Sequence, residues 1–580
     1  MKDAARKTAP SDFANKLATL SPAKRALLDK LSAKGKHGGN TLIAKTLRRL
    51  GISHAYCLAG TPIHKTMGAC IKEGIRVLGV RHQQAAVMMS LAHNYTTGKM
   101  TSIAMASFGP AVTNMVTGVL NARDDCWPLI VIGGRQPIDT QHMGCFQDLD
   151  AIPIFSPITK WTAAVRKTED IPEYLERAYH IATEGRPGPV YLDIPVESLE
   201  RSATLPPSPA RETAPPPTVD TQKIKLAADL LSKAMRPALL LGKGIRWSMP
   251  TEELSRLIGK LNMPFSASPM GRGYLPDDHP LCFNGLSTDL QGGADTVIMV
   301  GARMNWTFRF GSELAKDAKF IQIDICPDEI GRNITPDIGI VGDIKTVLQA
   351  LLAEIEHSNP ADAITKDRCS WVEHMDARRK ERNSQMQALS NSDNIPISPH
   401  RMCREIRDFL PRNAIVTVDG STIMAAVQQV IPSYLPASRL TAGVNGCMGT
   451  AVPYAIGAKI ANPERPVIAI SGDSGFGFNA MEMEMAVRHR VPVIFIVANN
   501  GGIVGSVFQN IVAPDYTERT ALFEPGIRYE KIMEAFGGHY ESVSRAEEIG
   551  PALARSANSG LPACVNIFID PDVPPLDHMG

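Results

Sequence analysis

Apolar and polar positions follow one another along most of the chain in an order that predicts strands and helices in turn. Short apolar runs of β-type composition are separated by stretches with helical spacing, an order typical of a parallel sheet covered by helices. The clearest runs occupy residues 77–80, 102–106, 129–132, 238–241, 296–300, 320–324, 467–470 and 493–497. The pattern predicts an α/β fold built from doubly wound parallel-sheet domains.

Two segments interrupt this pattern and are predicted to be linkers. Residues 203–219 hold six prolines in seventeen positions, a composition that favours extended, unpaired backbone. Residues 357–395 are polar and rich in charge. A chain of 580 residues is long enough for about three or four domains. The expected organisation is an N-terminal extension at 1–39, α/β domains at 40–202, 222–356 and 396–580, and linkers at 203–221 and 357–395.

Composition narrows the classes of function. The chain has 61 Lys and Arg residues against 59 Asp and Glu, a formal charge of +2, so no global basic field is available to hold a nucleic-acid backbone. The longest apolar stretches are far shorter than the roughly 20 residues that cross a bilayer, and no secretory apolar core stands near Met1. The ten cysteines form no C-x-x-C pair, which favours reduced thiols. We expect a cytoplasmic protein that binds neither nucleic acid nor membrane.

The strongest chemical signal lies at the ends of two predicted strands. The run 467–470 leads into SGDSG, which carries Asp473, and the run 493–497 leads into NNGG, which carries Asn500. Parallel strands joined by a helix end at one edge of the sheet, where α/β folds bind ligands. Carboxylate, amide and main-chain carbonyl oxygens suit Mg²⁺, with phosphate oxygens and water completing its shell. The glycines beside Asp473 let the backbone approach a diphosphate, whose charge the following helix favours.

At these residues the sequence resembles the thiamine-diphosphate-dependent enzymes of the acetohydroxyacid synthase and oxalyl-CoA decarboxylase type. The resemblance covers roughly residues 40–571 and points most specifically to 2-hydroxyacyl-CoA lyase and oxalyl-CoA decarboxylase. It is carried by CWPLIVIGG at 126–134, MGCFQ at 143–147, GARMNW at 301–306 and AFGG at 535–538. It implies a pyrimidine-binding domain, a central Rossmann-like domain and a diphosphate-binding domain, in that order.

The resemblance also implies which residues hold the cofactor. Asp473, Asn500 and the main-chain oxygen of Gly502 would bind Mg²⁺. Met448 would support the folded thiamine diphosphate from beneath, and the Gly446 carbonyl would accept from its 4′-amino group. The further cofactor contacts would be Gly60, Pro62, Gly472, Ser474, Gly475 and Ile503, with Phe146 and Gln147 on the substrate side. A buried core methionine and plain loop packing are the alternative interpretations.

One position departs from the family pattern. Within RHQQAA at 81–86, Gln83 stands where the family has a glutamate that protonates N1′ of the aminopyrimidine. An amide hydrogen-bonds to N1′ but cannot exchange a proton with it near neutral pH. Three interpretations follow. The enzyme works without the carboxylate, as glyoxylate carboligase does; Gln83 is an engineered replacement of a native glutamate; or the chain is a cofactor-binding protein of regulatory or structural function with little turnover.

The activity implied by the resemblance is chemistry at a C–C bond beside a carbonyl, through a C2 ylide and an enamine. The first hypothesis is a Mg²⁺-dependent lyase or decarboxylase that acts on a 2-oxo or 2-hydroxyacyl thioester, bound to CoA or to a carrier protein. The alternative is an acetolactate-synthase-like carboligase that joins a 2-oxo acid to an aldehyde or thioester, in a biosynthetic assembly line for example.

Other segments suggest further ligands and partners. Family enzymes build the site between subunits, which implies a homodimer or homotetramer. The sequence LGKG at 241–244 follows a predicted strand and Asp324 ends another, which would suit ADP, FAD or the nucleotide of CoA in the central domain, although a lone G-x-G is a weak signal. Residues 20–28 resemble amphipathic linkers of nonribosomal peptide and polyketide assembly lines, and the segment 20–34 would dock on an acidic carrier protein.

Overall fold

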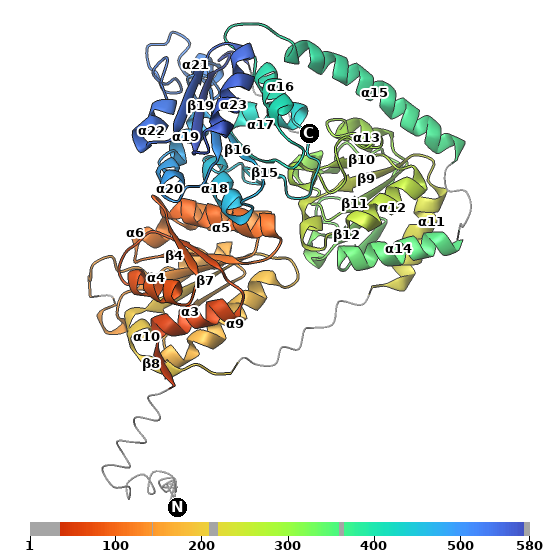
Figure 1. Cartoon of the computed structure of the whole chain (residues 1–580). Helices are drawn as coiled ribbons and strands as arrows, with labels where there is room; N and C mark the ends of the chain where they lie inside the picture. The colour runs from red at the N-terminus through yellow and green to blue at the C-terminus, as the bar shows by residue number, and fades with distance from the viewer. Residues whose placement is uncertain (1–34, 142, 208–218, 359–364, 574–580) are drawn as a thin grey trace, which may run out of the picture.

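The computed structural model describes residues 35–141, 143–207, 219–358 and 365–573. Within these ranges the chain forms three parallel sheets of five or six strands with helices on their faces (Figure 1). We call them the N-terminal, middle and C-terminal units; Figure 1 draws them in red to orange, yellow to green, and cyan to blue. The predicted α/β class with doubly wound parallel sheets is confirmed. No helix in these ranges combines the length and apolar character needed to cross a membrane.

The N-terminal unit has strand order β3-β2-β4-β5-β7-β6, and every neighbouring pair is parallel. Its strands are β2 (His54–Cys57), β3 (Arg76–Gly79), β4 (Ser102–Ala106), β5 (Leu129–Arg135), β6 (Trp161–Ala164) and β7 (Pro189–Pro195). Its helices are α3 (Gly39–Arg49), α4 (Ile63–Lys72), α5 (Gln83–Thr97), α6 (Pro110–Thr113), α7 (Val116–Asp125), α8 (Ile152–Phe155), α9 (Ile171–Thr183) and α10 (Val196–Glu200). The apolar runs predicted at 77–80, 102–106 and 129–132 are strands of this sheet.

The middle unit has strand order β10-β9-β11-β12-β13, again parallel throughout. Its strands are β9 (Pro237–Leu241), β10 (Phe265–Ala267), β11 (Thr296–Val300), β12 (Lys319–Asp324) and β13 (Ile338–Val341). Its helices are α11 (Thr221–Lys233), α12 (Thr251–Leu261), α13 (Ser287–Gly293) and α14 (Ile344–Ser358). The aliphatic side chains of α11, α12 and α14 pack against the sheet in one buried cluster, which explains why the three runs predicted here are strands.

The C-terminal unit has strand order β15-β14-β16-β17-β19-β18 and is also parallel. Its strands are β14 (Ile415–Asp419), β15 (Arg439–Thr441), β16 (Val467–Gly472), β17 (Ile494–Asn499), β18 (His539–Val543) and β19 (Ala563–Phe568). Its helices are α16 (Pro399–Phe409), α17 (Ser421–Val430), α18 (Ala451–Ala461), α19 (Asp473–Asn479), α20 (Glu482–Arg488), α21 (Val507–Val512), α22 (Glu530–Phe536) and α23 (Ile549–Asn558). The strands β16 and β17 are neighbours, which places their following loops side by side.

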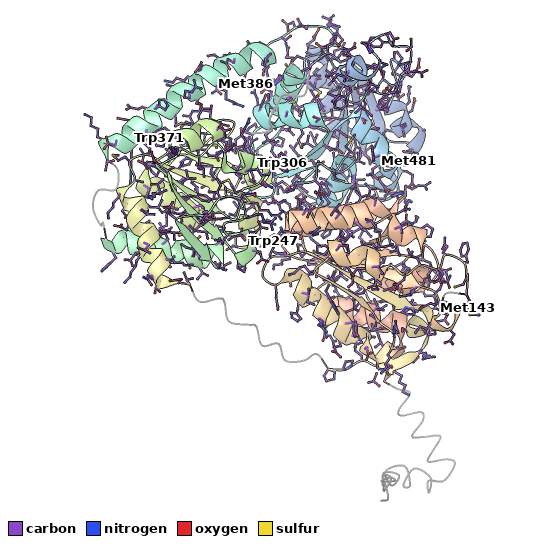
Figure 2. The ribbon with its side chains drawn as sticks, turned by 180° about the vertical axis from the view of Figure 1, so that it is seen from behind. Met143, Trp247, Trp306, Trp371, Met386 and Met481 are labelled. Atoms are coloured by element: carbon purple, nitrogen blue, oxygen red, sulfur yellow. The ribbon has the colours of Figure 1, made fainter. Side chains whose placement is uncertain are left out.

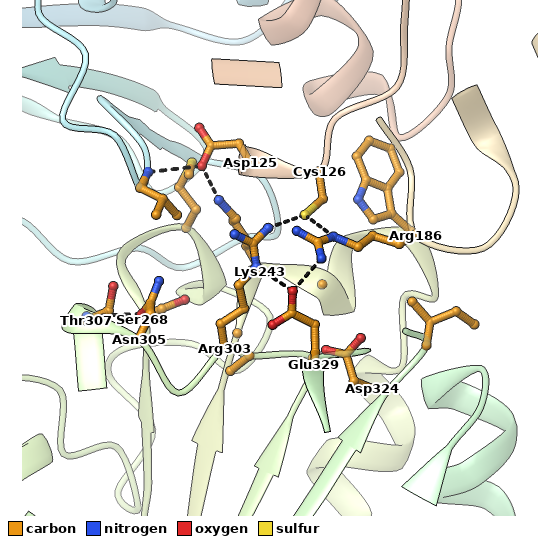
Figure 3. Close-up of a pocket in the computed structure, with 18 of the residues that line it drawn as sticks. Asp125, Cys126, Arg186, Lys243, Ser268, Arg303, Asn305, Thr307, Asp324 and Glu329 are labelled. Carbon is orange, nitrogen blue, oxygen red and sulfur yellow. Dashed lines mark hydrogen bonds and ion pairs between the residues drawn. The ribbon is translucent and has the colours of Figure 1, made fainter. Parts of the chain in front are cut away.

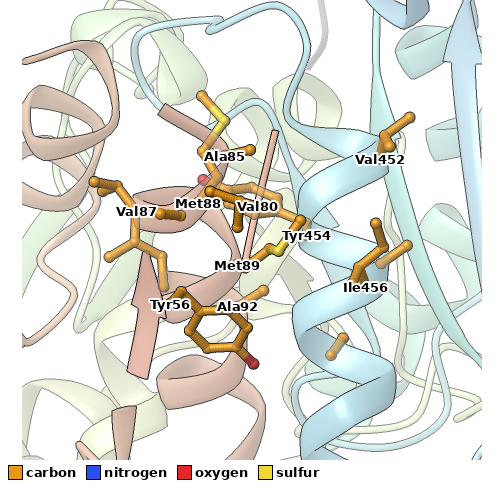
Figure 4. Close-up of a cluster of buried hydrophobic side chains, with 14 of the residues drawn as sticks. Tyr56, Val80, Ala85, Val87, Met88, Met89, Ala92, Val452, Tyr454 and Ile456 are labelled. Atoms are coloured by element: carbon orange, nitrogen blue, oxygen red, sulfur yellow. The ribbon is translucent and has the colours of Figure 1, made fainter. Parts of the chain in front are cut away.

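Helices α5 and α18 join the N-terminal and C-terminal units along one apolar interface (Figure 4). Met88 and Met89 of α5 and Tyr454 of α18 are fully buried and belong to one hydrophobic cluster that spans both units. A Cβ on Gly457 would lie 2.2 Å from the Met89 carbonyl oxygen, so the two helices approach too closely for any larger residue there. The relative position of the N-terminal and C-terminal units is therefore fixed by dense packing.

The segments predicted as extensions and linkers contain secondary structure. Strand β1 (Lys36–Gly38), at the end of the predicted extension, pairs antiparallel with β8 (Ser202–Thr204), at the start of the predicted proline-rich linker. The segment 357–395 contains a 25-residue helix, α15 (Lys366–Ser390), which runs from the middle unit towards the C-terminal unit in Figure 1. Residues 20–34, predicted to dock on a carrier protein, lie outside the described residues.

Helix α15 is attached to the middle unit by Trp371, which Figure 2 labels beside it. The side chain is 4% exposed, its Nε1–H donates to the Pro237 carbonyl at 3.1 Å, and its ring lies so close to Gly293 that a Cβ there would be 2.5 Å from it. Because few other side chains of α15 are buried, its polar sequence concealed this contact.

Replacing Trp371 with alanine should destabilise the middle unit by about 3–5 kcal/mol, because a large buried ring is lost and a cavity remains. Scanning calorimetry would show a lower transition temperature for the melting step that includes this unit. The exposed Glu373 on the same helix provides the control, since Glu373→Ala should leave the transition unchanged. Equal transition temperatures for the two variants would show that α15 connects the middle and C-terminal units without stabilising the middle unit.

Candidate functional site

The predicted metal ligands lie together at the carboxyl edge of the C-terminal sheet. Asp473 follows β16, and Asn500 and Gly502 follow the adjacent β17, in parallel register with Gly472 opposite Ala498. One end of the Asn500 amide lies 2.9 Å from the Gly502 carbonyl oxygen and 3.1 Å from Asp473 Oδ1. With the amide nitrogen at this end, it donates to both oxygens while the amide oxygen accepts from the Gly505 N–H at 3.0 Å, so hydrogen bonding alone favours this orientation. With the amide oxygen there, three oxygens face one another, an arrangement that a cation between them would stabilise.

Asp473 is deeply buried, and burial raises the pKa of its carboxyl to about 7. Oδ1 accepts from the Ser474 N–H at 2.8 Å, and Oδ2 accepts from the Gly502 N–H at 3.1 Å. These two hydrogen bonds favour the ionised carboxylate and lower its pKa, against the effect of burial. These bonds fix the carboxylate towards the Asn500 amide. A carboxylate, an amide and a carbonyl form an oxygen set that fits Mg²⁺, so the residues present fit the metal that the resemblance implies.

Asp419, at the end of β14, is a buried carboxylate that the sequence did not single out. It accepts from the Ser471 hydroxyl and, at 3.1 Å, from the Ala451 N–H, and burial raises its pKa. A Cβ on Gly475 would lie 2.9 Å from Asp419 Oδ1. Asp419 therefore ties the Asp473 segment to the loop before α18. The only sequence signal was an Asp-Gly pair after an apolar run, which is common in turns.

The loop between β15 and α18 carries Gly446 and Met448 at the same edge of the sheet. Met448 is half-buried and Gly446 is exposed, so neither belongs to the apolar core. The loop is fixed by Asn479 at the end of α19, whose Nδ2–H donates to the Gly449 carbonyl at 2.6 Å. Of the other predicted contacts, Gly472, Ser474 and Gly475 adjoin Asp473, and Ile503 follows Gly502 with its side chain partly exposed.

The predicted pyrimidine-side residues lie at the carboxyl edge of the N-terminal sheet. Gly60 and Pro62 follow β2, and a Cβ on Gly60 would be 2.9 Å from the Ser107 hydroxyl in the loop after β4. Gln147, in the loop after β5, has φ 58° and its carbonyl lies 2.7 Å from where a Cβ on Gly109 would stand. Phe146 beside it is 78% exposed. The loops that follow β2, β4 and β5 therefore converge at this edge of the N-terminal sheet.

Gln83 is the first residue of α5 and lies at the same edge, almost fully buried. Its Oε1 accepts from Asn114 Nδ2 at 3.0 Å. Because this bond uses the carbonyl oxygen of the amide, the Gln83 nitrogen is the end available to a ligand. In the described part of the chain, no hydrogen bond joins Gln83 to Asp473, Asn500 or Gly502.

Glu482 of α20 connects the two units at the start of α5, and sequence analysis missed it. Its carboxylate accepts from the Arg81 N–H at 3.0 Å and from the His82 N–H at 2.9 Å, and it is 1% exposed. Burial raises its pKa to about 7. A negative charge at a helix N-terminus is favourable, so Glu482 fixes the end of α5 that carries Gln83. In the sequence it is one acid within an ordinary helical stretch.

A cavity of about 320 Å³ lies where the three units meet (Figure 3). Gly242 and Gly244 line it, but a Cβ on Gly242 would lie 2.1 Å from the Gly301 carbonyl oxygen. These glycines are therefore explained by the contact between two loops of the middle unit, without a nucleotide. Asp324 also lines the cavity, and burial raises its pKa to about 6.

Comparison with protein families supports the same division of the chain. Residues 37–154 match the model for the N-terminal TPP binding domain of thiamine pyrophosphate enzymes. Residues 224–351 match the central domain of these enzymes, and residues 419–567 match their C-terminal TPP binding domain. The two regions that match TPP binding domains contain the residues described above at the carboxyl edges of the N-terminal and C-terminal sheets.

Individual relatives cover nearly the whole chain. A 2-hydroxyacyl-CoA lyase of Arabidopsis thaliana is 34% identical over 92% of this chain and 96% of its own length. An oxalyl-CoA decarboxylase of Escherichia coli is 32% identical over 92% and 95%, and an acetolactate synthase large subunit of Mycobacterium tuberculosis is 31% identical over 94% and 98%. The chain therefore belongs to the thiamine diphosphate-dependent enzymes, in the group that contains 2-hydroxyacyl-CoA lyase, oxalyl-CoA decarboxylase and acetolactate synthase.

Proposed function

We propose that this enzyme is a Mg²⁺-dependent lyase or decarboxylase that acts on a 2-oxo or 2-hydroxyacyl thioester. When bound, thiamine diphosphate supplies an electron sink for cleavage of a C–C bond beside a carbonyl. The observation that carries the proposal is the convergence of Asp473, Asn500 and the Gly502 carbonyl on one point at the sheet edge. These three residues would hold Mg²⁺, and Gly472, Ser474, Gly475 and Ile503 would lie beside the diphosphate.

At the edge of the N-terminal sheet, Gln83 would bind the aminopyrimidine as a hydrogen-bond donor. Asn114 donates to its carbonyl oxygen, so the Gln83 amide N–H would be the group that donates to N1′ of a bound ring. An amide cannot hold or release a proton at this atom near neutral pH. Gln83 would therefore orient the ring, and Gly446 and Met448 would support it from the C-terminal half-site.

The two half-sites are completed by a second copy of the chain. Large apolar side chains stand exposed beside both of them: Met143 and Phe146 next to the pyrimidine-side loops, and Phe478 and Met481 after Asp473. Figure 2 shows Met143 and Met481 at the outside of the molecule. Exposed apolar patches of this kind are typical of interaction surfaces. A homodimer would bury them and bring a Gln83 half-site to an Asp473 half-site.

Products distinguish the proposed activity from its alternative. The holoenzyme should be incubated separately with oxalyl-CoA, a 2-hydroxyacyl-CoA and pyruvate, and products followed by mass spectrometry. Formyl-CoA or a released aldehyde is expected. An acyloin or acetolactate from pyruvate would favour the carboligase, which the relative from Mycobacterium tuberculosis makes the second candidate. Loading the same acyl group on an acidic carrier protein tests the role proposed for residues 20–34, and no product from any substrate would contradict both activities.

A further inference from the structure

Helix α20 of the C-terminal unit lies against the N-terminal unit (Figure 1), and its Glu482 binds the backbone there. Oε1 accepts from the Arg81 N–H at 3.0 Å and from the His82 N–H at 2.9 Å, and Oε2 accepts from the same Arg81 N–H at 3.2 Å. Glu482 is 1% exposed, so little water reaches these bonds. Hydrogen bonds to an ionised acceptor are roughly twice as strong as neutral ones, so the carboxylate fixes this backbone firmly.

The backbone that Glu482 holds leads directly into Gln83, the first residue of α5. His82 is the N-cap of this helix, and its Nδ1 accepts from the Gln84 N–H at 3.2 Å. The Gln83 side chain is almost fully buried, and its carbonyl oxygen accepts from Asn114. The direction of its amide N–H therefore depends on the position of the first turn of α5, which Glu482 fixes from the C-terminal unit.

The charged groups around Glu482 leave its carboxylate on the backbone. The Arg81 guanidinium lies 3.9 Å from Glu484, and Arg488 pairs with Glu484 at 2.9 Å. Burial raises the pKa of the Glu482 carboxyl to about 7, and the two N–H donors and the charges of Arg81 and Arg488 act against this rise. Burial lowers the pKa of the neighbouring His82 imidazole. Glu482 is thus a buried acid that changes charge near neutral pH.

We propose that Glu482 is a positioning residue for the reaction, which in its ionised form holds the first turn of α5 so that the Gln83 amide meets N1′ of the cofactor. The inference rests on the proposed function, in which Gln83 orients the aminopyrimidine. Protonation of Glu482 removes the charge and weakens its bonds to the backbone. An amide does not titrate near neutral pH, so Glu482, and not Gln83, gives this step its dependence on pH.

Proton exchange at C2 of the bound cofactor, followed in deuterium oxide, tests the proposal apart from turnover. Glu482→Gln turns an NH₂ group towards the Arg81 N–H, so it should lower the rate about 10-fold at about pH 8 through misplacement of Gln83. Between about pH 8 and about pH 6 the unaltered protein should lose more of its rate than this variant, because only its Glu482 takes up a proton.

Two control variants isolate Glu482. Glu484→Gln removes the same charge from a half-buried position on the same helix, where an ion pair contributes little, and should keep the rate and its pH dependence. His82→Asn keeps an N-cap without a titratable ring and should keep the loss of rate at low pH. If Glu482→Gln does not fold, as judged by circular dichroism, Glu482→Asp retains the charge and should also keep that loss.

A double variant separates positioning from a purely structural role. In a Gln83→Ala background, Glu482→Gln should have no further effect on exchange, because the amide that it positions is gone. Calorimetry should give Glu482→Gln the same affinity for thiamine diphosphate and Mg²⁺ as the unaltered protein. No binding to the unaltered protein would contradict the proposed function itself. Binding with unchanged exchange in Glu482→Gln, an equal loss with and without Gln83, or a pH dependence removed only by His82→Asn would overturn this inference alone.

Discussion

Asp473→Asn should abolish Mg²⁺-dependent binding of thiamine diphosphate, with a loss of affinity of at least about 100-fold, or about 2.7 kcal/mol. Asparagine has nearly the same size and keeps an acceptor for the Ser474 or Gly502 N–H, so the local fold should persist. What is lost is the negative charge that faces the Asn500 amide and the Gly502 carbonyl. Neutral oxygens alone bind a strongly hydrated divalent cation poorly.

Isothermal titration calorimetry measures this loss directly, when the cofactor is added to the protein first in the presence of Mg²⁺ and then in the presence of a chelator. Asp408→Asn is a suitable control, because it removes the same charge from an exposed position on α16 and should bind as the unaltered protein does. If Asp473→Asn took up the cofactor with unchanged dependence on Mg²⁺, the assignment of the metal site would be wrong.

Much of the sheet architecture could be predicted because the strands are short, buried on both faces and almost purely apolar. The runs 102–106 and 296–300 coincide with β4 and β11, and the ends of two such runs located Asp473 and Asn500. Their proximity followed from the rule that parallel strands present their carboxyl ends at one edge. The sequence therefore contained both halves of the proposed metal site.

The parts that escaped prediction depend on contacts between distant segments. Glu482 contacts the start of α5 about 400 residues earlier in the chain, and Asp419 links two loops of its own sheet edge. Neither has a local pattern that separates it from an ordinary surface acid. Helix α15 was missed because its long polar sequence offers few apolar positions, although Trp371 anchors it. The G-x-G at 242–244 shows the opposite weakness of a short motif, since the packing of two loops accounts for its glycines whether or not a nucleotide binds there.

Gln83→Glu should accelerate proton exchange at C2 of the bound cofactor by about 10²- to 10⁴-fold, the usual contribution of a positioned acid or base. The new carboxylate would occupy the place of the amide, with Asn114 still donating to one oxygen. Burial at this position raises the pKa of a carboxyl group towards neutrality, which suits proton transfer to N1′, while the start of α5 favours its charge.

Quenched exchange in deuterium oxide, read by proton NMR of the released cofactor, measures this step apart from turnover. Gln84→Glu places the same charge one residue later and half-buried, so it should leave exchange unchanged. Faster exchange together with slower product formation would show that the enzyme is adapted to an amide at Gln83, and a rise in both would show that Gln83 limits the rate. Equal exchange in all three proteins, with the cofactor bound, would instead mean that another group moves the proton and that Gln83 only orients the ring.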